Sequence, residues 1–170
     1  MKKLFAQLLG DDFAAMVEAA KRLAENDAAS PKLRELLRQE RREATRHAIL
    51  YALSWQRDPR SWPIFVRVLS DRSESPLVRG QAAEGLAYHF HRKRKGSAGF
   101  ESALTALVAA SRDPSAEVRY YVAFALGASR DERALPVLRR MTRGRAVAAE
   151  AKDAIKHLSP TGRREGKSPA

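Results

Sequence analysis

The stretch Asp113–Arg140, DPSAEVRYYVAFALGASRDERALPVLRR, decides the fold. Its opening Asp-Pro is a helix start signal, because a short carboxylate accepts from free N–H groups and proline needs no partner in the first turn. Val118 and Leu126 lie on one helical face, and Gly127 stands where a helix could end in the left-handed conformation. A second helix is predicted to start at Asp131. Neither helix can bury its apolar face alone, so the pair needs neighbours.

The first helix of this pair recurs along the chain. Its valine and arginine are found again at Val78–Arg79, 40 residues earlier, and Thr45–Arg46 keep the frame a further 33 residues earlier. Towards the C-terminus Val147 fits 29 residues later, although Ala148 replaces the arginine. Repeats at such periods predict a stacked array of helix pairs.

The second helix gives an independent alignment. Arg57–Asp58 precede Pro63 by the spacing at which Arg130–Asp131 precede Pro136, and this shift of 73 residues equals the two earlier shifts combined. Agreement of arginine, aspartate and proline positions is much harder to obtain by chance than agreement of apolar residues. Both helices therefore indicate one repeat frame.

A V-R-x-x-A-A-x-A-L-G helix followed by D-x-x-A-L-P-x-L resembles HEAT repeats, in the short bacterial subtype named after phycobilisome lyases. The match is close over Glu117–Leu138 and partial over Thr45–Val68 and Leu77–Leu86. It implies an all-α fold, a short right-handed α-solenoid of about four helix pairs, with second helices lining a concave face. Residues 1–40 would be capping helices and residues 41–158 the repeats. The resemblance also implies a structural ladder between units, formed by Arg46, Arg79, Arg119, Asp58 and Asp131.

Helix boundaries follow from capping signals and apolar spacing. We expect Trp55 to lie just past its helix, and Trp62 to be a core residue. Residues 91–99 form a basic, glycine-containing loop, and residues 159–170 have too little apolar content to fold, which predicts a disordered basic tail. The expected helices span residues 4–9, 11–25, 32–40, 45–54, 60–69, 76–89, 100–110, 114–128, 131–140 and 147–158.

Composition restricts the chemistry. The chain has no cysteine, which excludes disulfides, thiolate zinc sites and cysteine nucleophiles and favours a cytoplasmic location. The apolar run after the N-terminus is too short for a signal peptide, and no segment reaches the roughly 18 apolar residues of a membrane span. The net charge is +12, yet residues 1–40 hold 7 basic and 7 acidic side chains, so the excess lies in the remainder.

No constellation of residues indicates catalysis. His89 and His91 form a superficial metal pair without a third ligand nearby in the sequence. Paired carboxylates such as Asp11–Asp12 stand at helix starts, where the helix dipole explains them. We therefore expect no metal, no cofactor and no enzymatic activity.

The repeat frame instead predicts a binding face. Three aromatic residues crowd one end of it, and exposed tyrosines are common interface anchors, although Tyr121 or Phe124 could also pack between neighbouring helices. The predicted lining is His47, Ala48, Tyr51, Gly80, Gln81, Glu84, Tyr120, Tyr121, Phe124, Ala149, Glu150 and Asp153. The leading hypothesis is a monomeric, non-catalytic module that binds a protein partner through His47, Tyr51, Gln81, Glu84, Tyr120, Tyr121 and Phe124. Basic edges would assist association with an acidic partner.

The alternative hypothesis is an accessory nucleic-acid-binding protein. Its phosphate contacts would come from a basic loop, a helix edge and the tail, because the predicted concave face contains three carboxylates. The contact residues would be Arg92, Lys93, Arg94, Lys95, Arg139, Arg140, Arg143 and Arg145. A well-solvated basic surface without function is the competing explanation. Action on a bilin protein rests only on the name of the repeat subtype.

Overall fold

The computed structural model describes residues 1–158, and within them every regular element is helical. Four short 3-10 turns precede or follow α-helices, at Asp27–Ala29, Pro59–Ser61, Phe90–Arg92 and Glu132–Ala134. The α-helices are α1 (Lys2–Leu8), α2 (Phe13–Ala24), α3 (Ser30–Gln39), α4 (Glu43–Trp55), α5 (Trp62–Ser70), α6 (Pro76–His89), α7 (Ala98–Ala110), α8 (Ala116–Ala128), α9 (Leu135–Met141) and α10 (Ala148–Leu158).

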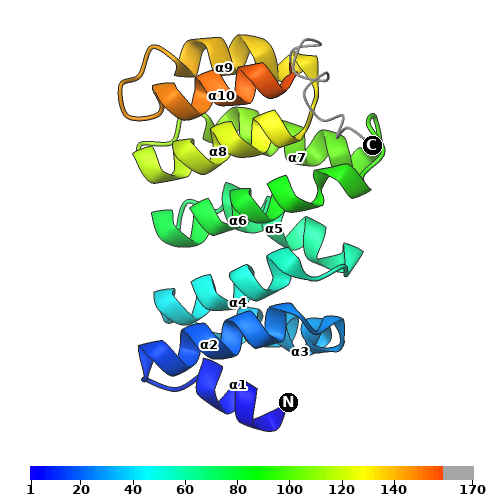
Figure 1. Cartoon of the computed structure of the whole chain (residues 1–170), viewed down its shortest axis with the longest axis vertical. Coiled ribbons are helices and arrows are strands. Elements are labelled where there is room, and N and C mark those ends of the chain that lie inside the picture. The colour runs from blue at the N-terminus through cyan, green and yellow to red at the C-terminus, as the bar shows by residue number, and fades with distance from the viewer. Residues whose placement is uncertain (159–170) are drawn as a thin grey trace, which may run out of the picture.

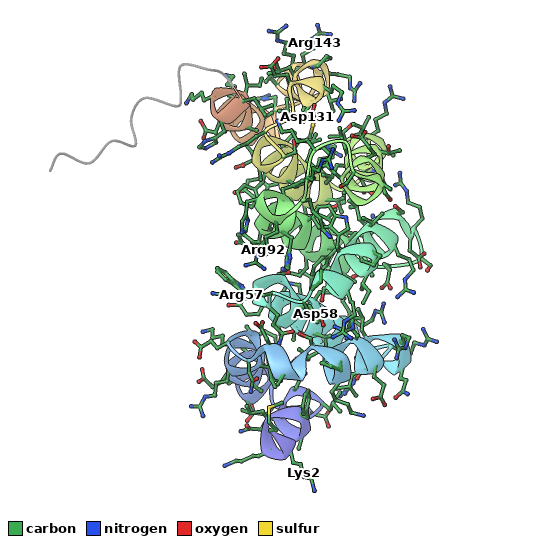
Figure 2. The ribbon with its side chains drawn as sticks, turned by 90° about the vertical axis from the view of Figure 1, so that its right-hand side faces the viewer. Lys2, Arg57, Asp58, Arg92, Asp131 and Arg143 are labelled. Atoms are coloured by element: carbon green, nitrogen blue, oxygen red, sulfur yellow. The ribbon has the colours of Figure 1, made fainter. Side chains whose placement is uncertain are left out.

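The helices form two layers (Figure 1). Helices α2, α4, α6, α8 and α10 stack in chain order as the inner layer, and α3, α5, α7 and α9 form the outer layer. Figure 2 shows the same stack from the side after a turn of 90° about its long axis, with several helices seen almost end on. Each outer helix follows an inner one, which gives four successive pairs beginning at α2. The prediction of a short α-solenoid of about four helix pairs is confirmed.

A continuous core fills the space between the layers. Phe65 of α5 and Phe100 of α7 are fully buried, as are Leu86 of α6 and Leu126 of α8. Trp62 is also buried, as expected, and its indole N–H donates to the Gly99 carbonyl at 2.8 Å. Every repeat therefore contributes apolar side chains that only its neighbours can cover.

Serine residues cap several of these helices. The hydroxyl oxygens of Ser75, Ser97 and Ser115 each accept a hydrogen bond from the backbone N–H three residues later, satisfying a donor of the first turn. The prediction that Asp113 caps α8 was wrong, because Ser115 occupies that position. The Asp113 carboxylate is instead buried and forms ion pairs with Arg72 and Arg79 of the preceding repeat.

Two local expectations were wrong. Helix α8 ends at Ala128, within the predicted span, but Gly127 lies inside it, and the left-handed conformation belongs to Arg130, at φ 52°. Glycine is required at 127 because an added Cβ would come within 2.9 Å of Ala154 Cα on α10. Trp55 is the last residue of α4 and not a loop residue, so its side chain belongs to the inner layer.

The loops gather at two opposite edges of the stack. One edge, here called the arginine edge, holds loops 40–42, 71–75, 111–115 and 142–147, and the opposite edge holds loops 56–61, 90–97 and 129–134. Figure 1 shows this separation for loop 142–147 on the left and loop 90–97 on the right. Chain direction causes it, because inner helices begin at the arginine edge and outer helices end there.

Two further expectations concern membrane-spanning helices and the C-terminal tail. Within residues 1–158 no helix combines the length and apolar character that crossing a bilayer requires. The predicted basic tail at residues 159–170 lies outside the described residues.

Candidate functional site

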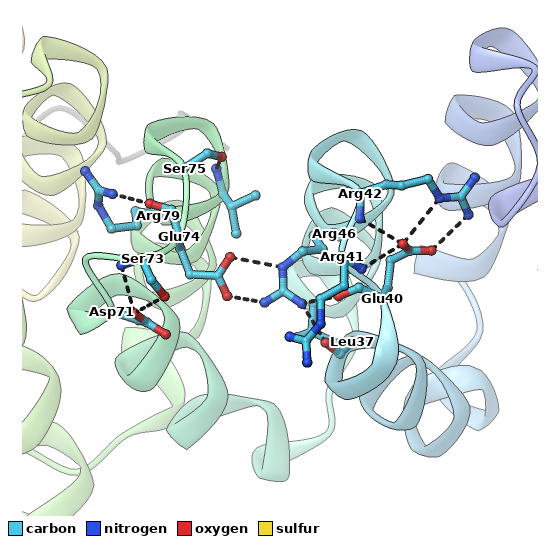
Figure 3. Close-up of polar contacts among 11 residues, drawn as sticks. Leu37, Glu40, Arg41, Arg42, Arg46, Asp71, Ser73, Glu74, Ser75 and Arg79 are labelled. Carbon is cyan, nitrogen blue, oxygen red and sulfur yellow. Dashed lines mark hydrogen bonds and ion pairs between the residues drawn. The ribbon is translucent and has the colours of Figure 1, made fainter.

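Arg46 joins two successive repeats at the arginine edge (Figure 3). Its guanidinium donates to the backbone carbonyls of Leu37 at 2.8 Å and Glu40 at 2.7 Å, which closes the loop before α4. The same group forms an ion pair with Glu74 in the loop before α6, with Nε to Oε2 at 3.0 Å. Arg46 thus ties the start of its own helix to the start of the next.

Arg79 repeats this arrangement one unit later. It donates to the carbonyl of Glu74 and, through one guanidinium nitrogen, to both carboxylate oxygens of Asp113 at 3.0 and 3.1 Å. The Arg79 side chain is 6% exposed and the Asp113 side chain is 1% exposed, so this is a buried ion pair. Arg72 reaches the same carboxylate from solvent at 3.0 Å.

The remaining predicted ladder residues do not all link repeats. Arg119 donates to the carbonyls of Asp113 and Pro114 at 2.6 and 2.8 Å, but no carboxylate of the described chain faces it. Asp58 does cross between units, through an ion pair with Arg34 of α3. The Asp131 carboxylate accepts from Arg133 within its own turn, and Arg133 also pairs with Glu101 of α7, so Asp131 reaches the preceding unit only through Arg133.

A row of aromatic rings crosses three helices of the inner layer. Tyr51 lies 6.3 Å from Trp55 between ring centroids, Trp55 lies 4.8 Å from Tyr88, and Tyr88 lies 6.1 Å from Phe124. We call Tyr51, Trp55, Tyr88 and Phe124 the aromatic row. Trp55 is 51% exposed and the other three are half-buried, so part of each ring is accessible to solvent and to a binding partner.

The sequence prediction found only part of this row. It placed Tyr51 and Phe124 on the inner face but missed Trp55 and Tyr88, which stand nine residues after Arg46 and Arg79 in the shared frame. The predicted lining ends five residues after each arginine. One more helical turn along the same face reaches both rings, so the repeat frame contained the signal.

Glu84 lies among these aromatic residues. Its carboxylate accepts from the Tyr88 hydroxyl at 3.0 Å and from the Gln81 amide at 2.7 Å. Gln81 was predicted to contact a partner, but its side chain is 5% exposed and supports Glu84 from beneath. Gln81 is therefore a positioning residue, which corrects its assignment as a contact residue.

Charge and burial shift several pKa values on this face. Burial raises the pKa of Tyr88 to about 12, and the Glu84 carboxylate adds to that shift. Burial together with Glu84 also raises the pKa of Tyr121. Burial lowers the pKa of His47, while the Glu84 and Glu117 carboxylates oppose that change. The Tyr88 hydroxyl therefore stays protonated near neutral pH and donates to the Glu84 carboxylate.

Tyr120 and Tyr121 extend the aromatic surface towards the start of α8. Their rings meet edge to face at a centroid distance of 5.3 Å, and Tyr120 is 45% exposed. Tyr121 is half-buried, and its ring covers Gly80 so closely that an added Cβ would lie 2.9 Å from Cδ2. Tyr120 is therefore exposed, as expected for an interface anchor, whereas Tyr121 packs between α8 and α6, which was the alternative expectation for that residue.

Two hollows border the aromatic row at the C-terminal ends of the inner helices. One of about 360 Å³ lies beside Trp55, Tyr88, His91 and Arg92. The other, about 680 Å³, shares His91 and reaches α10; it is lined by Phe90, Lys93, Lys95, Phe124, Glu150, Asp153 and His157 among others. The two share Ala87 and His91, so together they extend the face from α4 to α10.

The predicted polyanion contacts do not form one surface. Arg92, Lys93, Arg94 and Lys95 lie on the opposite edge, where Figure 2 shows Arg92 near Arg57. Their charges are partly engaged: Lys93 lies over the Trp62 ring at 5.1 Å, and Lys95 donates to the Arg130 carbonyl. The other predicted contacts, Arg139, Arg140, Arg143 and Arg145, stand at or beside loop 142–147 on the arginine edge. A single contact surface built from both sets is therefore excluded.

Comparison with known proteins agrees with this geometry. Residues 71–158, half of the chain, match the family described as HEAT repeats. The chain belongs to the HEAT-repeat family. This HEAT-repeat protein has the fold of a chain in the complex of CpcE and CpcF of phycocyanin lyase from Nostoc sp. PCC7120, with a TM-score of 0.79 and 22% identity. The likeness covers 91% of this chain and 96% of that one.

A second similarity is to an enzyme. Over 73 residues the HEAT-repeat chain is 38% identical to deoxyhypusine hydroxylase from Rattus norvegicus, a match covering 43% of this chain and 21% of that enzyme. The chain thus matches about a fifth of that relative's length. The comparisons show a repeat scaffold, and the activities of both relatives remain properties of those proteins.

Proposed function

We propose that this HEAT-repeat chain is a non-catalytic module that binds a protein segment along the inner face, with the aromatic row as its central contact. The observation that carries the proposal is the continuity of Tyr51, Trp55, Tyr88 and Phe124 across three successive repeats. Partly exposed aromatic rings in a hollow face bury large areas on binding at low entropic cost.

The charge of the face specifies the segment further. The Glu84 carboxylate lies beside the rings of Tyr88 and Tyr121, whereas the adjoining hollow combines Glu150 and Asp153 with Lys93 and Lys95 and so favours neither charge. A lysine or arginine side chain of the partner would pair with Glu84 while its aliphatic part lies on the rings. The proposed ligand is therefore a segment with apolar residues and at least one basic residue. The expectation of an acidic partner concerns the edges of the stack and stays a prediction.

Affinity capture with paired variants tests the proposal. The full chain carrying Trp55→Ala and Tyr88→Ala should lose proteins that the unchanged chain captures from a cell lysate. Phe13→Ala is the matched control, since Phe13 is 68% exposed on α2 and lies outside the row. Glu84→Gln should weaken capture of the same proteins by about tenfold, the value of one charge-assisted contact of about 1.4 kcal/mol. Identical capture by the row variant and the control would refute the site, provided that both keep the helical circular dichroism signal.

A further inference from the structure

The arginine edge carries a row of guanidinium groups that form no ion pair with a carboxylate of residues 1–158. Within residues 1–158, the loops of this edge and the adjoining helix ends contribute nine such arginines, none of them in an ion pair: Arg38, Arg41, Arg67, Arg112, Arg119, Arg139, Arg140, Arg143 and Arg145. Lysine is absent from these segments. The row runs the length of the stack from α3 to α10.

The ladder explains why these charges stay free. It uses three carboxylates of the edge, because Glu40 pairs with Arg42, Glu74 with Arg46, and Asp113 with the two arginines of the preceding repeat. In the last repeat the corresponding loop supplies no acid at all, and Arg143 and Arg145 occupy it instead. The net positive charge of this edge is therefore a consequence of the repeat frame itself.

One notch between repeats shows how the guanidinium groups converge. A hollow of about 200 Å³ is lined by four arginines from α3, α4 and α5 and the loops beside them: Arg38, Arg41, Arg46 and Arg67. Asp71 and Glu74 also line it, but Asp71 accepts from Ser73 and Glu74 is paired with Arg46. The Asp71 carboxylate keeps its charge near Arg67, so four arginines face two carboxylates and a net positive charge is left to meet an oxyanion that enters the notch.

We propose that the arginine edge binds the phosphate backbone of duplex nucleic acid. Guanidinium groups are planar and donate in pairs, which suits phosphate oxygens. Loops 40–42, 71–75, 111–115 and 142–147 contain no aromatic side chain on which the bases of a single strand could stack. They also offer no large apolar side chain of the kind that anchors a protein interface. This surface is separate from the aromatic row, so the proposal is independent of the proposed function.

Salt-dependent binding of the full chain to a DNA duplex of two helical turns tests this inference by fluorescence anisotropy. The edge variant is Arg143→Gln with Arg145→Gln, two exposed residues without a side-chain contact in the described structure. Its control is Arg57→Gln with Arg94→Gln, which removes the same charge from exposed positions on the opposite edge. A second edge variant, Arg38→Gln with Arg41→Gln, tests the same surface at the other end of the stack.

The unchanged chain should bind at about 50 mM salt and lose affinity steeply as salt is added. Each edge variant should make the logarithmic salt slope shallower by about 1.8 and weaken binding near 0.1 M salt by about tenfold or more. The control should keep most of its affinity. Absence of binding at low salt, or equal losses in edge and control variants, would overturn the proposal. So would polyglutamate that competes as well as DNA at equal charge, since an acidic protein surface would then be the ligand.

Discussion

Removing the Asp113 carboxylate tests the ladder most severely. Its side chain is 1% exposed and that of Arg79 is 6% exposed, so Asp113→Ala leaves a buried guanidinium without its counter-ion. Removal of one partner of a buried pair costs about 3–5 kcal/mol, because the desolvated charge is no longer compensated. Asp113 also accepts from the Ser115 N–H at 2.9 Å, and losing that bond adds to the cost. We expect Asp113→Ala to lower the free energy of unfolding by about 4 kcal/mol.

Urea unfolding at neutral pH, followed by circular dichroism, measures this loss. The control is Asp153→Ala on α10, whose ion pair with Lys156 is exposed and screened by solvent, so its loss should change the free energy of unfolding far less. Replacing both members of the buried pair, Arg79→Met with Asp113→Leu, should recover much of the lost stability. If Asp113→Ala proved no more damaging than Asp153→Ala, the ladder could not be what joins the repeats.

Two further variants test other contacts. Gly127→Ala should destabilise the fold, because the added Cβ would lie 2.9 Å from Ala154 Cα, and overpacking of about 1–3 kcal/mol exceeds the gain in helix propensity. Gly144→Ala, whose Cβ would have no such close neighbour, should leave stability unchanged. Equal stability of the two variants would contradict the close α8–α10 contact. Burial, together with the Arg92 charge, lowers the pKa of His89 in the folded chain below the unfolded value of about 6.5. The contribution of the neutral His89 imidazole to the free energy of unfolding is therefore complete above that pH and declines as the pH falls. Between about pH 7 and pH 5 the chain carrying His89→Gln should therefore lose less stability than the unchanged chain, and identical losses in urea unfolding would reject this cause.

Much of the fold could be predicted from the repeat frame. The spacing of Arg46, Arg79 and Arg119 was enough to indicate stacked helix pairs, because each arginine opens an inner helix at the same edge. Local signals were less reliable. Asp113 resembles a helix cap in the sequence, yet its neighbour in space is an arginine of the preceding repeat, which no local pattern contains.

The site was only partly predictable for a related reason. Trp55 was assigned to a loop, and a residue outside a helix cannot be placed on a helical face. Gln81 lies on the same helix face as Glu84, and only its burial decides whether it contacts a partner or donates to that carboxylate. The burial of a polar side chain cannot be read directly from the sequence. The two basic clusters were combined because net charge carries no information about which edge a loop occupies.

Site-specific photo-crosslinking tests the central claim most directly. A photoreactive phenylalanine analogue at position 88 would lie within the aromatic row, and the same analogue at position 105 would lie exposed on α7 of the outer layer. The account predicts that position 88 crosslinks to a basic, partly apolar segment of a captured protein, and that Glu84→Gln diminishes this product. Equal yields from positions 88 and 105, or a product unaffected by Glu84→Gln, would contradict binding at the aromatic row.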